Sequence, residues 1–320
     1  MNFKMMDFKH TSVLLAETIE NLKPKNDGLY VDGTFGGGGH ARYLLSKLDR
    51  GTLVAFDQDE YAINSAKLNF ADLLQADSNP QLKLVHDNFS HLQLNLVKLG
   101  YPDGIDGIYY DLGVSSPQFD QAGRGFSYRF DARLDMRMDQ SQSLDAYQLV
   151  NNSSQKELAD ILYKFGGEKF SRQIAHKIVE SRQKTPIATT FELVDVIKEA
   201  IPAFARRTGG HPAKKTFQAL RVVVNRELEV LHDSLEEAIE LLKPGGRISV
   251  ITFQSDEDKI VKGIFKKYSE VEVPRGMPMV PDSMKPTLRL VNRKPIVASP
   301  KELKNNNRSH SAKLRVAEKL

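Results

Sequence analysis

Three apolar runs in the first part of the chain each end in an aspartate, and this repeated pattern restricts the fold more than any other feature. The runs with their final acids are Gly28–Asp32, Gly51–Asp57 and Ile105–Asp111. Short runs of β-branched and aromatic residues predict buried strands, and the segments between these runs have helical spacing. Strands that alternate with helices predict a parallel sheet with right-handed crossovers, and therefore an α/β fold.

The alternation stops in the middle of the chain, where the pattern becomes helical with no convincing strand. Thr216–Leu242 then has the spacing of one long amphipathic helix, Pro244–Gly246 predicts a turn, and Arg247–Phe253 is again β-branched. We therefore expect the sheet to resume after a helical insertion. The expected parts are an α/β domain of residues 1–120 and 214–300, a helical insertion of residues 121–213, and a basic tail of residues 301–320.

The first of the three acids opens a glycine-rich run, Asp32–His40. Glycine adopts positive φ and lets a ligand approach the backbone closely, and ligands of open α/β sheets bind at the carboxyl ends of the strands. The spacing of Gly36, Gly38 and Ala41 satisfies the loose dinucleotide fingerprint, with Asp57 about 20 residues further on. A nicotinamide dinucleotide and S-adenosylmethionine (AdoMet) are therefore the two candidate cofactors.

Asp32 favours AdoMet over the dinucleotide. A carboxylate directly before the loop repels a pyrophosphate, which a helix N-terminus would otherwise bind, whereas AdoMet offers an ammonium and a sulfonium group. Asp57 is then expected to accept hydrogen bonds from the vicinal ribose hydroxyls. Asp87–Ser90 follows the third expected strand, Leu82–His86, where the adenine edge would lie. Phe89 either packs on the adenine or is an ordinary loop anchor.

Several long stretches spread over nearly the whole chain are distinctive. They are His10–Leu15, Asp32–His40, Asp111–Gln118, Arg124–Ser127, Leu134–Met138, Gly167–Ser171, His211–Lys214, Thr216–Arg221 and Ser309–Arg315. Together they resemble the bacterial 16S ribosomal RNA cytosine-N4 methyltransferases. The resemblance implies a Rossmann-like AdoMet methyltransferase domain with a helical substrate-recognition insertion, and methylation of the exocyclic N4 of a cytidine in the decoding centre of small-subunit rRNA. Gln254 departs from the family, which usually has a histidine there.

The same resemblance implies which residues bind AdoMet. They are Gly38, Gly39, His40, Asp57, Phe89, Asp111 and Gln118. The additional stretch Phe70–Pro80 is expected to be a loop insertion far from the chemistry. The sequence has no cysteine and no HExxH or paired-carboxylate spacing, so we expect neither a disulfide framework nor a catalytic metal.

Methyl transfer to a cytosine amine needs in-line positioning and an acceptor for the amine hydrogens. Amino-methyltransferases commonly place such acceptors after the fourth strand, in an Asp/Asn-Pro-Pro-aromatic loop, and here that loop is Ser115–Phe119. Pro117 would fix a backbone carbonyl that accepts from N4, while Ser116 or Asp111 would replace the missing acid. Asp111 is the best catalytic candidate, with pure AdoMet binding as its alternative; His40 is a further candidate acceptor or a binding residue.

The net charge of +4 is unevenly distributed. Residues 285–320 contain ten basic and two acidic residues, a charge of +8, which leaves −4 for the rest. A basic segment on an acidic body indicates a polyanionic partner, unless it is a solvated extension. Further basic clusters are Arg124, Arg129, Arg133 and Arg137, and Arg206, Arg207, Lys214 and Lys215. With the resemblance, they predict phosphate contacts to 16S rRNA within the small ribosomal subunit, and a target base splayed out of its stack.

Three alternatives stay open: an AdoMet enzyme acting on a DNA base or a protein amine, a non-catalytic ribosome-assembly factor that retains AdoMet, and a nicotinamide oxidoreductase. Analysis of rRNA nucleosides, a methyl-transfer assay on small subunits, and titration with AdoMet and NAD separate them. No apolar run approaches the roughly 20 residues that span a bilayer, and no signal core is found. We therefore expect a cytoplasmic protein without a membrane partner; a homodimer is compatible with this interpretation.

Overall fold

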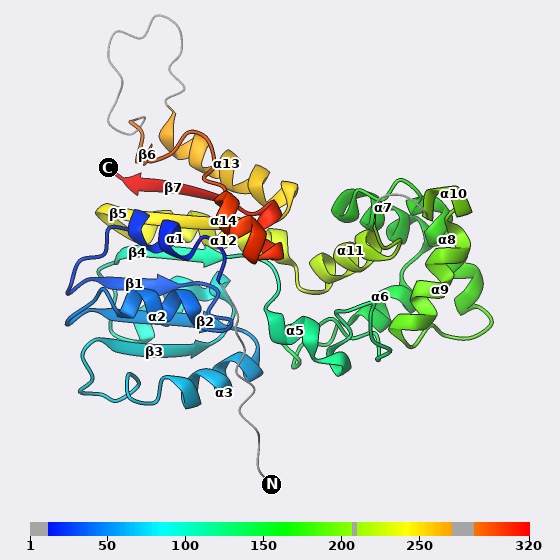
Figure 1. Ribbon diagram of the computed structural model, residues 1–320, viewed down its shortest axis with the longest axis horizontal. Helices are drawn as coiled ribbons and strands as arrows, with labels where there is room; N and C mark the ends of the chain where they lie inside the picture. The colour runs from blue at the N-terminus through cyan, green and yellow to red at the C-terminus, as the bar shows by residue number, and fades with distance from the viewer. Residues whose placement is uncertain (1–11, 207–209, 271–284) are drawn as a thin grey trace, which may run out of the picture. The chain divides into compact units, whose positions relative to one another are not determined.

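The computed structural model describes residues 12–206, 210–270 and 285–320. Within these ranges the chain forms two compact units (Figure 1). The sheet unit consists of the described residues of Met1–Gly113 and Glu229–Leu320, and the helical unit consists of those of Val114–Leu228. The chain therefore leaves the sheet unit once and later returns to it, as an inserted domain requires.

One sheet forms the centre of the sheet unit. Its strands are β1 (Leu29–Asp32), β2 (Thr52–Asp57), β3 (Gln81–His86), β4 (Ile105–Asp111), β5 (Leu242–Thr252), β6 (Leu288–Leu290) and β7 (Lys313–Lys319). They lie in the order β3-β2-β1-β4-β5-β7-β6. Neighbours from β3 to β5 are parallel, whereas β7 is antiparallel to both β5 and β6. The order reverses between β1 and β4, so a topological switch point lies at their carboxyl ends.

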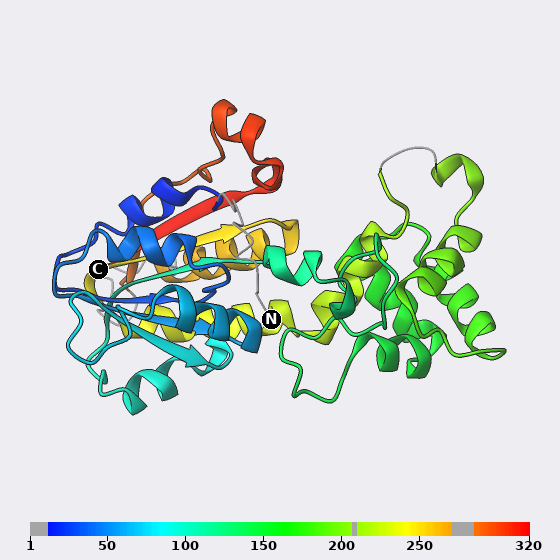
Figure 2. The ribbon, with the colours of Figure 1, turned by 60° about the horizontal axis from the view of Figure 1, so that its bottom comes forward.

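Helices cover both faces of this sheet (Figure 2). They include α1 (Leu15–Asn21), α2 (Gly39–Leu45), α3 (Glu60–Asn69), α4 (Leu92–Lys98), α12 (Glu227–Leu241), α13 (Ser255–Ser269) and α14 (Pro300–Asn305). Val31, Phe56 and Tyr110 belong to one core with α4, α12 and α13, while Tyr30 and Tyr109 belong to a second core with α1, α2 and α3. Alternate strand residues thus enter opposite cores, which explains the continuous apolar runs in the sequence.

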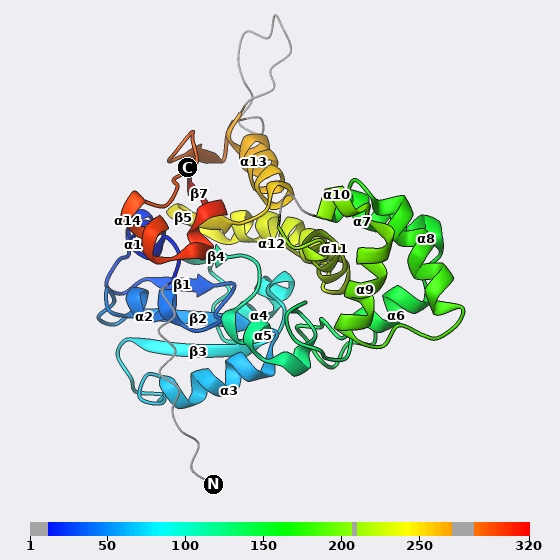
Figure 3. The ribbon, with the colours of Figure 1, turned by 45° about the vertical axis from the view of Figure 1, so that its right-hand side comes forward.

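The helical unit has its own core. Its helices are α5 (Ser116–Asp120), α6 (Ala146–Asn152), α7 (Gln155–Gly166), α8 (Ser171–Arg182), α9 (Thr190–Ala200), α10 (Ala203–Arg206) and α11 (Lys214–Val224). Helix α7 lies against α8 and α11, and α8 lies against α9 (Figure 3). Leu158, Ile174 and Leu220 are fully buried between them. Ser154 and Thr189 begin α7 and α9 with capping boxes.

The predicted α/β fold with a helical insertion is confirmed, but the insertion is longer than expected. It begins at Val114 and ends at Leu228, where we expected residues 121–213. The single helix expected over Thr216–Leu242 is two helices, α11 and α12. The break follows Asn225, whose side chain accepts a hydrogen bond from the Met138 amide and donates one to the Met136 carbonyl. The next residue, Arg226, has a φ of 49°. The helical spacing of apolar residues continues across this break, which hides it from the sequence pattern.

Two further expectations about the end of the chain are wrong. Pro244–Gly246 is not a turn before a strand; it lies inside β5, where pairing with β4 is irregular and Gly245 has a φ of 80°. Residues 301–320 are not a tail, because β7 is an inner strand of the sheet with Leu314 and Val316 fully buried. Apolar residues at every second position are typical of a strand, even where charged residues alternate with them.

Among the described residues, none of the helices has the length and apolarity that crossing a bilayer requires.

Candidate functional site

Three aspartates meet at the carboxyl edge of the sheet, because β2, β1 and β4 are neighbours. Asp57, Asp32 and Asp111 are the last residues of these strands. The pairing register places Asp32 beside Ala55 on one side and beside Tyr109 on the other. The three predicted strand-ending acids are therefore confirmed, and they surround the switch point at which ligands of such sheets bind.

Asp32 is the most deeply buried of the three acids, with 1% of its surface exposed. Its Oδ2 accepts a hydrogen bond from the Tyr109 hydroxyl (2.6 Å), and its Oδ1 accepts one from the Thr34 amide (2.9 Å). Burial raises the pKa of Asp32 to about 7 in spite of these two hydrogen bonds, and the charge of Asp57 acts in the same direction. The sequence alone does not identify Tyr109 as a site residue, because only the pairing of β1 with β4 brings it beside Asp32.

The glycine run forms the turn from β1 into α2. Gly36 and Gly38 have φ values of 52° and 73°, in the left-handed region that other residues avoid. A Cβ atom on Gly38 would meet the ring of Phe35 at 2.7 Å and the ring of Phe70 at 2.8 Å. Both the backbone and the packing therefore require glycine at this position.

Phe70 corrects the expectation that Phe70–Pro80 is remote from the chemistry. The residues after Phe70 form turns, as an insertion would, but the Phe70 ring is buried edge-on against Phe35 with 5.5 Å between centroids. The Phe70 ring therefore packs against the glycine turn and supports it. Nothing in the local sequence indicates this contact, because it joins the end of α3 to a loop thirty-odd residues earlier.

Asp57 fastens the glycine turn to β2. Its Oδ2 accepts a hydrogen bond from the Gly36 amide (2.9 Å), and its Oδ1 accepts one from the Asp59 amide (2.8 Å). Burial raises the pKa of Asp57 to about 6, although these two hydrogen bonds act to lower it. Each carboxylate oxygen has further acceptor capacity, so these bonds are compatible with the predicted contact to ribose hydroxyls, which stays a prediction.

Asp111 holds a buried oxygen atom that has no hydrogen-bond partner, Oδ1. Its Oδ2 lies 3.6 Å from His40 Nδ1, and its amide donates to Thr34 Oγ1 (2.6 Å). Burial raises the pKa of Asp111 to about 8, with Asp32 adding to the effect and Arg308 opposing it. Leaving a buried acceptor unpaired is costly, so this oxygen marks a position where a donor from a ligand fits.

His40 lies beside Asp111 at the start of α2. Its Nε2 is 3.1 Å from the Val13 carbonyl, which can only accept, so Nε2 carries a hydrogen. Nδ1 is then the nitrogen that faces the Asp111 carboxyl. The ring is only 6% exposed and is tilted against Tyr109, with 5.8 Å between centroids. This geometry orients His40 toward Asp111; its roles in binding AdoMet or accepting a proton stay predictions.

Ser116, Pro117 and Gln118 lie at the start of α5, in the helical unit. Gln118 is buried, and its Oε1 accepts a hydrogen bond from the Ser115 amide (3.0 Å) as part of a capping box. The carbonyl of Pro117 accepts one from the Gln121 amide (2.9 Å). These contacts define the helix start, and the predicted roles of the three residues toward the cofactor and the base stay predictions.

Phe89 follows β3 and begins the 3₁₀ helix η1 (Phe89–His91). Its ring lies edge-on to that of Tyr110, with 5.4 Å between centroids. It therefore anchors its loop on the sheet, and its contact with adenine stays a prediction.

Gln254, which departs from the family pattern, is the N-cap of α13, where its side chain accepts a hydrogen bond from the backbone amide of Glu257. Gln254 thus caps the first turn of α13. Among the described residues, no group of three or more His, Asp or Glu is arranged to hold a metal ion.

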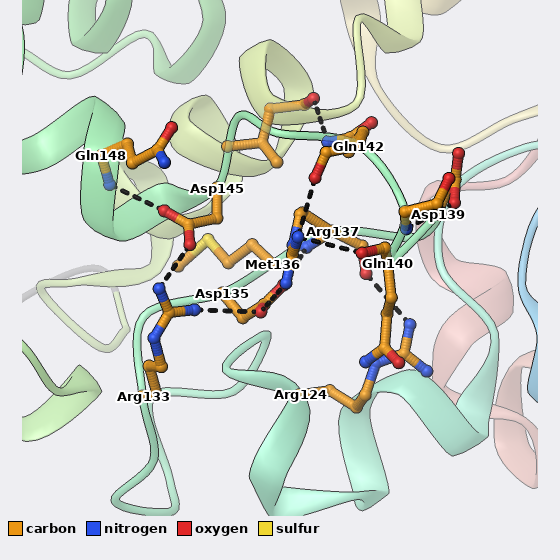
Figure 4. A network of polar contacts seen from close by, with 12 residues as sticks. Arg124, Arg133, Asp135, Met136, Arg137, Asp139, Gln140, Gln142, Asp145 and Gln148 are labelled. Carbon is orange, nitrogen blue, oxygen red and sulfur yellow. Dashed lines mark hydrogen bonds and ion pairs between the residues drawn. The ribbon is translucent and has the colours of Figure 1, made fainter.

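The arginines of the first basic cluster are engaged inside the helical unit (Figure 4). Arg133 donates to Asp135 and Asp145 (3.1 and 2.6 Å), and Arg137 binds Asp135 through Nε and Nη2 (2.9 and 2.8 Å). Arg124 is buried, and its Nη2 donates to the Arg137 carbonyl (3.0 Å). These contacts favour a structural role for the three guanidinium groups, which stabilise the loop before α6. The phosphate role predicted for these arginines stays a prediction.

Replacing Asp135 by alanine is expected to destabilise the protein by about 3 kcal/mol, because two guanidinium groups would lose their shared partner. Asp135 is 8% exposed, and the hydrogen bonds from Arg137 hold its pKa below the usual value against the effect of burial. Urea denaturation measures the change. Asp160→Ala is the control, since its ion pair with Lys156 is exposed and should contribute less than about 0.5 kcal/mol. Equal losses in the two variants would contradict the structural role of the network.

Three of the ten basic residues in the C-terminal segment 285–320 form ion pairs with acids of the sheet unit. Lys313 and Arg315 bind Asp258 (3.2 and 2.7 Å), and Arg289 binds Glu318. Glu318 is already counted in the +8 charge of residues 285–320, so Asp258 is the acid from outside this segment that these three pairs add. These three side chains are therefore weaker candidates for binding a polyanionic partner than the composition of the segment suggests.

Comparison with known proteins identifies the family of this chain. The sequence model of the MraW methylase family matches residues 7–320. A Lactobacillus acidophilus protein named ribosomal RNA small subunit methyltransferase H is 82% identical over 315 residues, which cover 98% of this chain and all of the relative. Proteins of the same name from Lactobacillus helveticus and Lactobacillus gasseri are 82% and 77% identical over the same shares of both chains. This chain therefore belongs to the MraW methylase family and is an AdoMet-dependent methyltransferase.

Proposed function

We propose that the protein methylates the exocyclic N4 of a cytidine in the decoding centre of 16S rRNA, within the small ribosomal subunit. The observation that carries the chemistry is the buried, unpartnered Oδ1 of Asp111 at the carboxyl end of β4. Support for the substrate comes from the relatives named for small-subunit rRNA, which match along nearly the whole chain, and from the resemblance to cytosine-N4 methyltransferases.

The residues at the switch point suit AdoMet. Three carboxyl groups, those of Asp32, Asp57 and Asp111, lie at neighbouring strand ends, where a cationic ligand is favoured electrostatically. The compact turn at Gly36 and Gly38 lets a ligand approach the backbone. When bound, AdoMet supplies an electrophilic methyl group on a sulfonium.

Asp111 is the group best placed to handle the proton of the reaction. The amine of cytosine is a weak nucleophile, because its lone pair is delocalised into the ring. An acceptor for its hydrogens raises its reactivity, and as the N–C bond forms and the S–C bond breaks, the Asp111 carboxylate can receive the leaving proton. A pKa raised to about 8 by burial places Asp111 close to the working pH, where general bases are most effective.

Cells that lack the protein provide the test of the substrate. Nucleosides from their 16S rRNA should contain less N4-methylated cytidine than those of wild-type cells when compared by mass spectrometry, and a plasmid copy of the gene should restore it. Unchanged N4-methylated cytidine would overturn the proposal. An altered DNA base or protein instead would favour another amine as the substrate.

AdoMet binding is expected to tighten as pH rises from 6 to 8. Burial raises the pKa values of Asp32 and Asp111 to about 7 and about 8, so both acids gain negative charge over this range and attract the cation more strongly. The dissociation constant should fall roughly tenfold per pH unit for each proton released. Calorimetry in buffers of different ionisation enthalpy measures the dissociation constant and the number of protons released on binding. Asp111→Asn should flatten the dependence, and a constant affinity in the wild type would contradict this explanation.

A further inference from the structure

Three aromatic rings form a stack in the helical unit that ends at the protein surface. The rings of Tyr128 and His211 are parallel, with 4.2 Å between centroids and 8° between planes. Phe217, buried in α11, presents its ring perpendicular to that of Tyr128 at 5.7 Å. His211 is exposed, whereas Tyr128 is partly buried. Tyr128 covers one face of the imidazole, and His211 as a residue remains exposed.

A backbone hydrogen bond fixes the tautomer of His211, the exposed ring of this aromatic stack. His211 Nδ1 accepts a hydrogen bond from the Ala213 amide (3.3 Å), so Nε2 carries the hydrogen at the exposed edge. Partial burial lowers the pKa of His211, and the nearby charges of Lys198 and Arg129 lower it further. The ring is therefore neutral at pH 7, and a flat neutral ring stacks on another π system without first losing a hydration shell.

Cationic side chains act electrostatically on His211 in the aromatic stack. Arg129 and Lys198 lie close enough to affect His211, and Lys214, the first residue of α11, is exposed. Lys198 forms an exposed pair with Asp195 (3.0 Å), which contributes little and is easily exchanged for another anion. These cations differ from Arg133 and Arg137, whose charges the network in Figure 4 satisfies.

A stacking face and adjacent cations together recognise one class of ligand. A nucleotide whose base is unstacked offers both a π face and a phosphate, and many folds bind single-stranded nucleic acid through these two groups. A protein partner would need an apolar or acidic surface, and the exposed neutral imidazole favours neither. We propose that the aromatic stack of Tyr128, His211 and Phe217 docks an unpaired nucleotide of the RNA substrate, with its base on His211 and its phosphate between Arg129 and Lys198. This proposal rests on the proposed rRNA substrate.

His211→Ala tests the proposal in the full-length protein. Base stacking typically contributes enough for KM toward small ribosomal subunits to rise roughly 5- to 100-fold. The dissociation constant for AdoMet should stay unchanged, because the acids and glycines that we propose bind AdoMet belong to the sheet unit. His211→Phe keeps a stacking ring and should restore KM to within a few-fold of wild type. His176→Ala, which removes an exposed histidine from α8 of the same unit, is the matched control and should have no effect.

Two outcomes would overturn the stacking proposal: a His211→Ala enzyme with wild-type KM, or a His211→Phe enzyme no better than His211→Ala. Fluorescence anisotropy with a labelled single-stranded RNA oligonucleotide provides a reading that does not depend on catalysis. If the wild type transfers no methyl group to small subunits, the proposed function fails. In that case the oligonucleotide decides the stacking proposal, which fails if His211→Ala binds it as tightly as wild type.

Discussion

Replacing Asp111 by asparagine is expected to lower kcat for methyl transfer by about 10²- to 10⁴-fold, the usual contribution of a general base. The amide has the same shape, so the strand end and the contact with Thr34 should persist, but it cannot take a proton from the amine. Single-turnover methylation of small subunits at saturating AdoMet measures the change. If Asp111 only binds AdoMet, the dissociation constant for AdoMet would rise while kcat at saturation stayed within about twofold of wild type.

Asp87→Asn is the matched control for this experiment. Asp87 also follows a strand of the sheet, but its carboxylate serves the adjoining loop, where it accepts hydrogen bonds from the Asn88 amide (2.7 Å) and the Asn95 side chain (2.8 Å). Its substitution should therefore reduce stability slightly and leave kcat nearly unchanged. Equal kcat losses in the two variants would mean that the effect is not specific to Asp111.

Gly38→Ala is expected to lower the free energy of unfolding by about 2 to 4 kcal/mol and to weaken AdoMet binding sharply. A φ of 73° costs a side-chain-bearing residue about 1 kcal/mol or more, and the new Cβ would lie 2.7 Å from the Phe35 ring and 2.8 Å from the Phe70 ring, an overpacking that costs about 1 to 3 kcal/mol. Urea denaturation and AdoMet calorimetry measure the two effects.

Gly37→Ala is the control in the same turn. A Cβ on Gly37 would have no atom within 4 Å, so its unfolding free energy should change by less than about 0.5 kcal/mol. If the two variants behaved alike, the close packing beneath Gly38 could not be the reason for its glycine.

The three acids of the site were predictable because their signal is local. Each of Asp32, Asp57 and Asp111 directly follows an apolar run, and parallel strands bring their carboxyl ends to one edge. The glycine turn was predictable for the same reason, since positive φ selects glycine residue by residue. The choice of AdoMet over a dinucleotide also rested on one neighbouring residue, and family membership agrees with it.

What the sequence could not provide depends on pairing between distant segments. Tyr109 donates to Asp32 only because β4 lies beside β1 in one register, and Phe70 supports the glycine turn only through tertiary packing. The pairing within the charge clusters was hidden for a related reason. A count of arginines does not reveal that Arg133 and Arg137 share Asp135, so a pattern typical of phosphate contact does not show that these guanidinium groups form an internal network.

Isotope-labelled methyl transfer in a purified system tests the central claim most directly. Small ribosomal subunits from cells that lack the protein are incubated with the purified protein and AdoMet labelled in its methyl group, and the rRNA is then digested and its nucleosides and fragments analysed by mass spectrometry. We predict label in N4-methylated cytidine, in the fragment that contains the decoding centre. Label in another nucleoside, in another fragment, or in none would contradict the account.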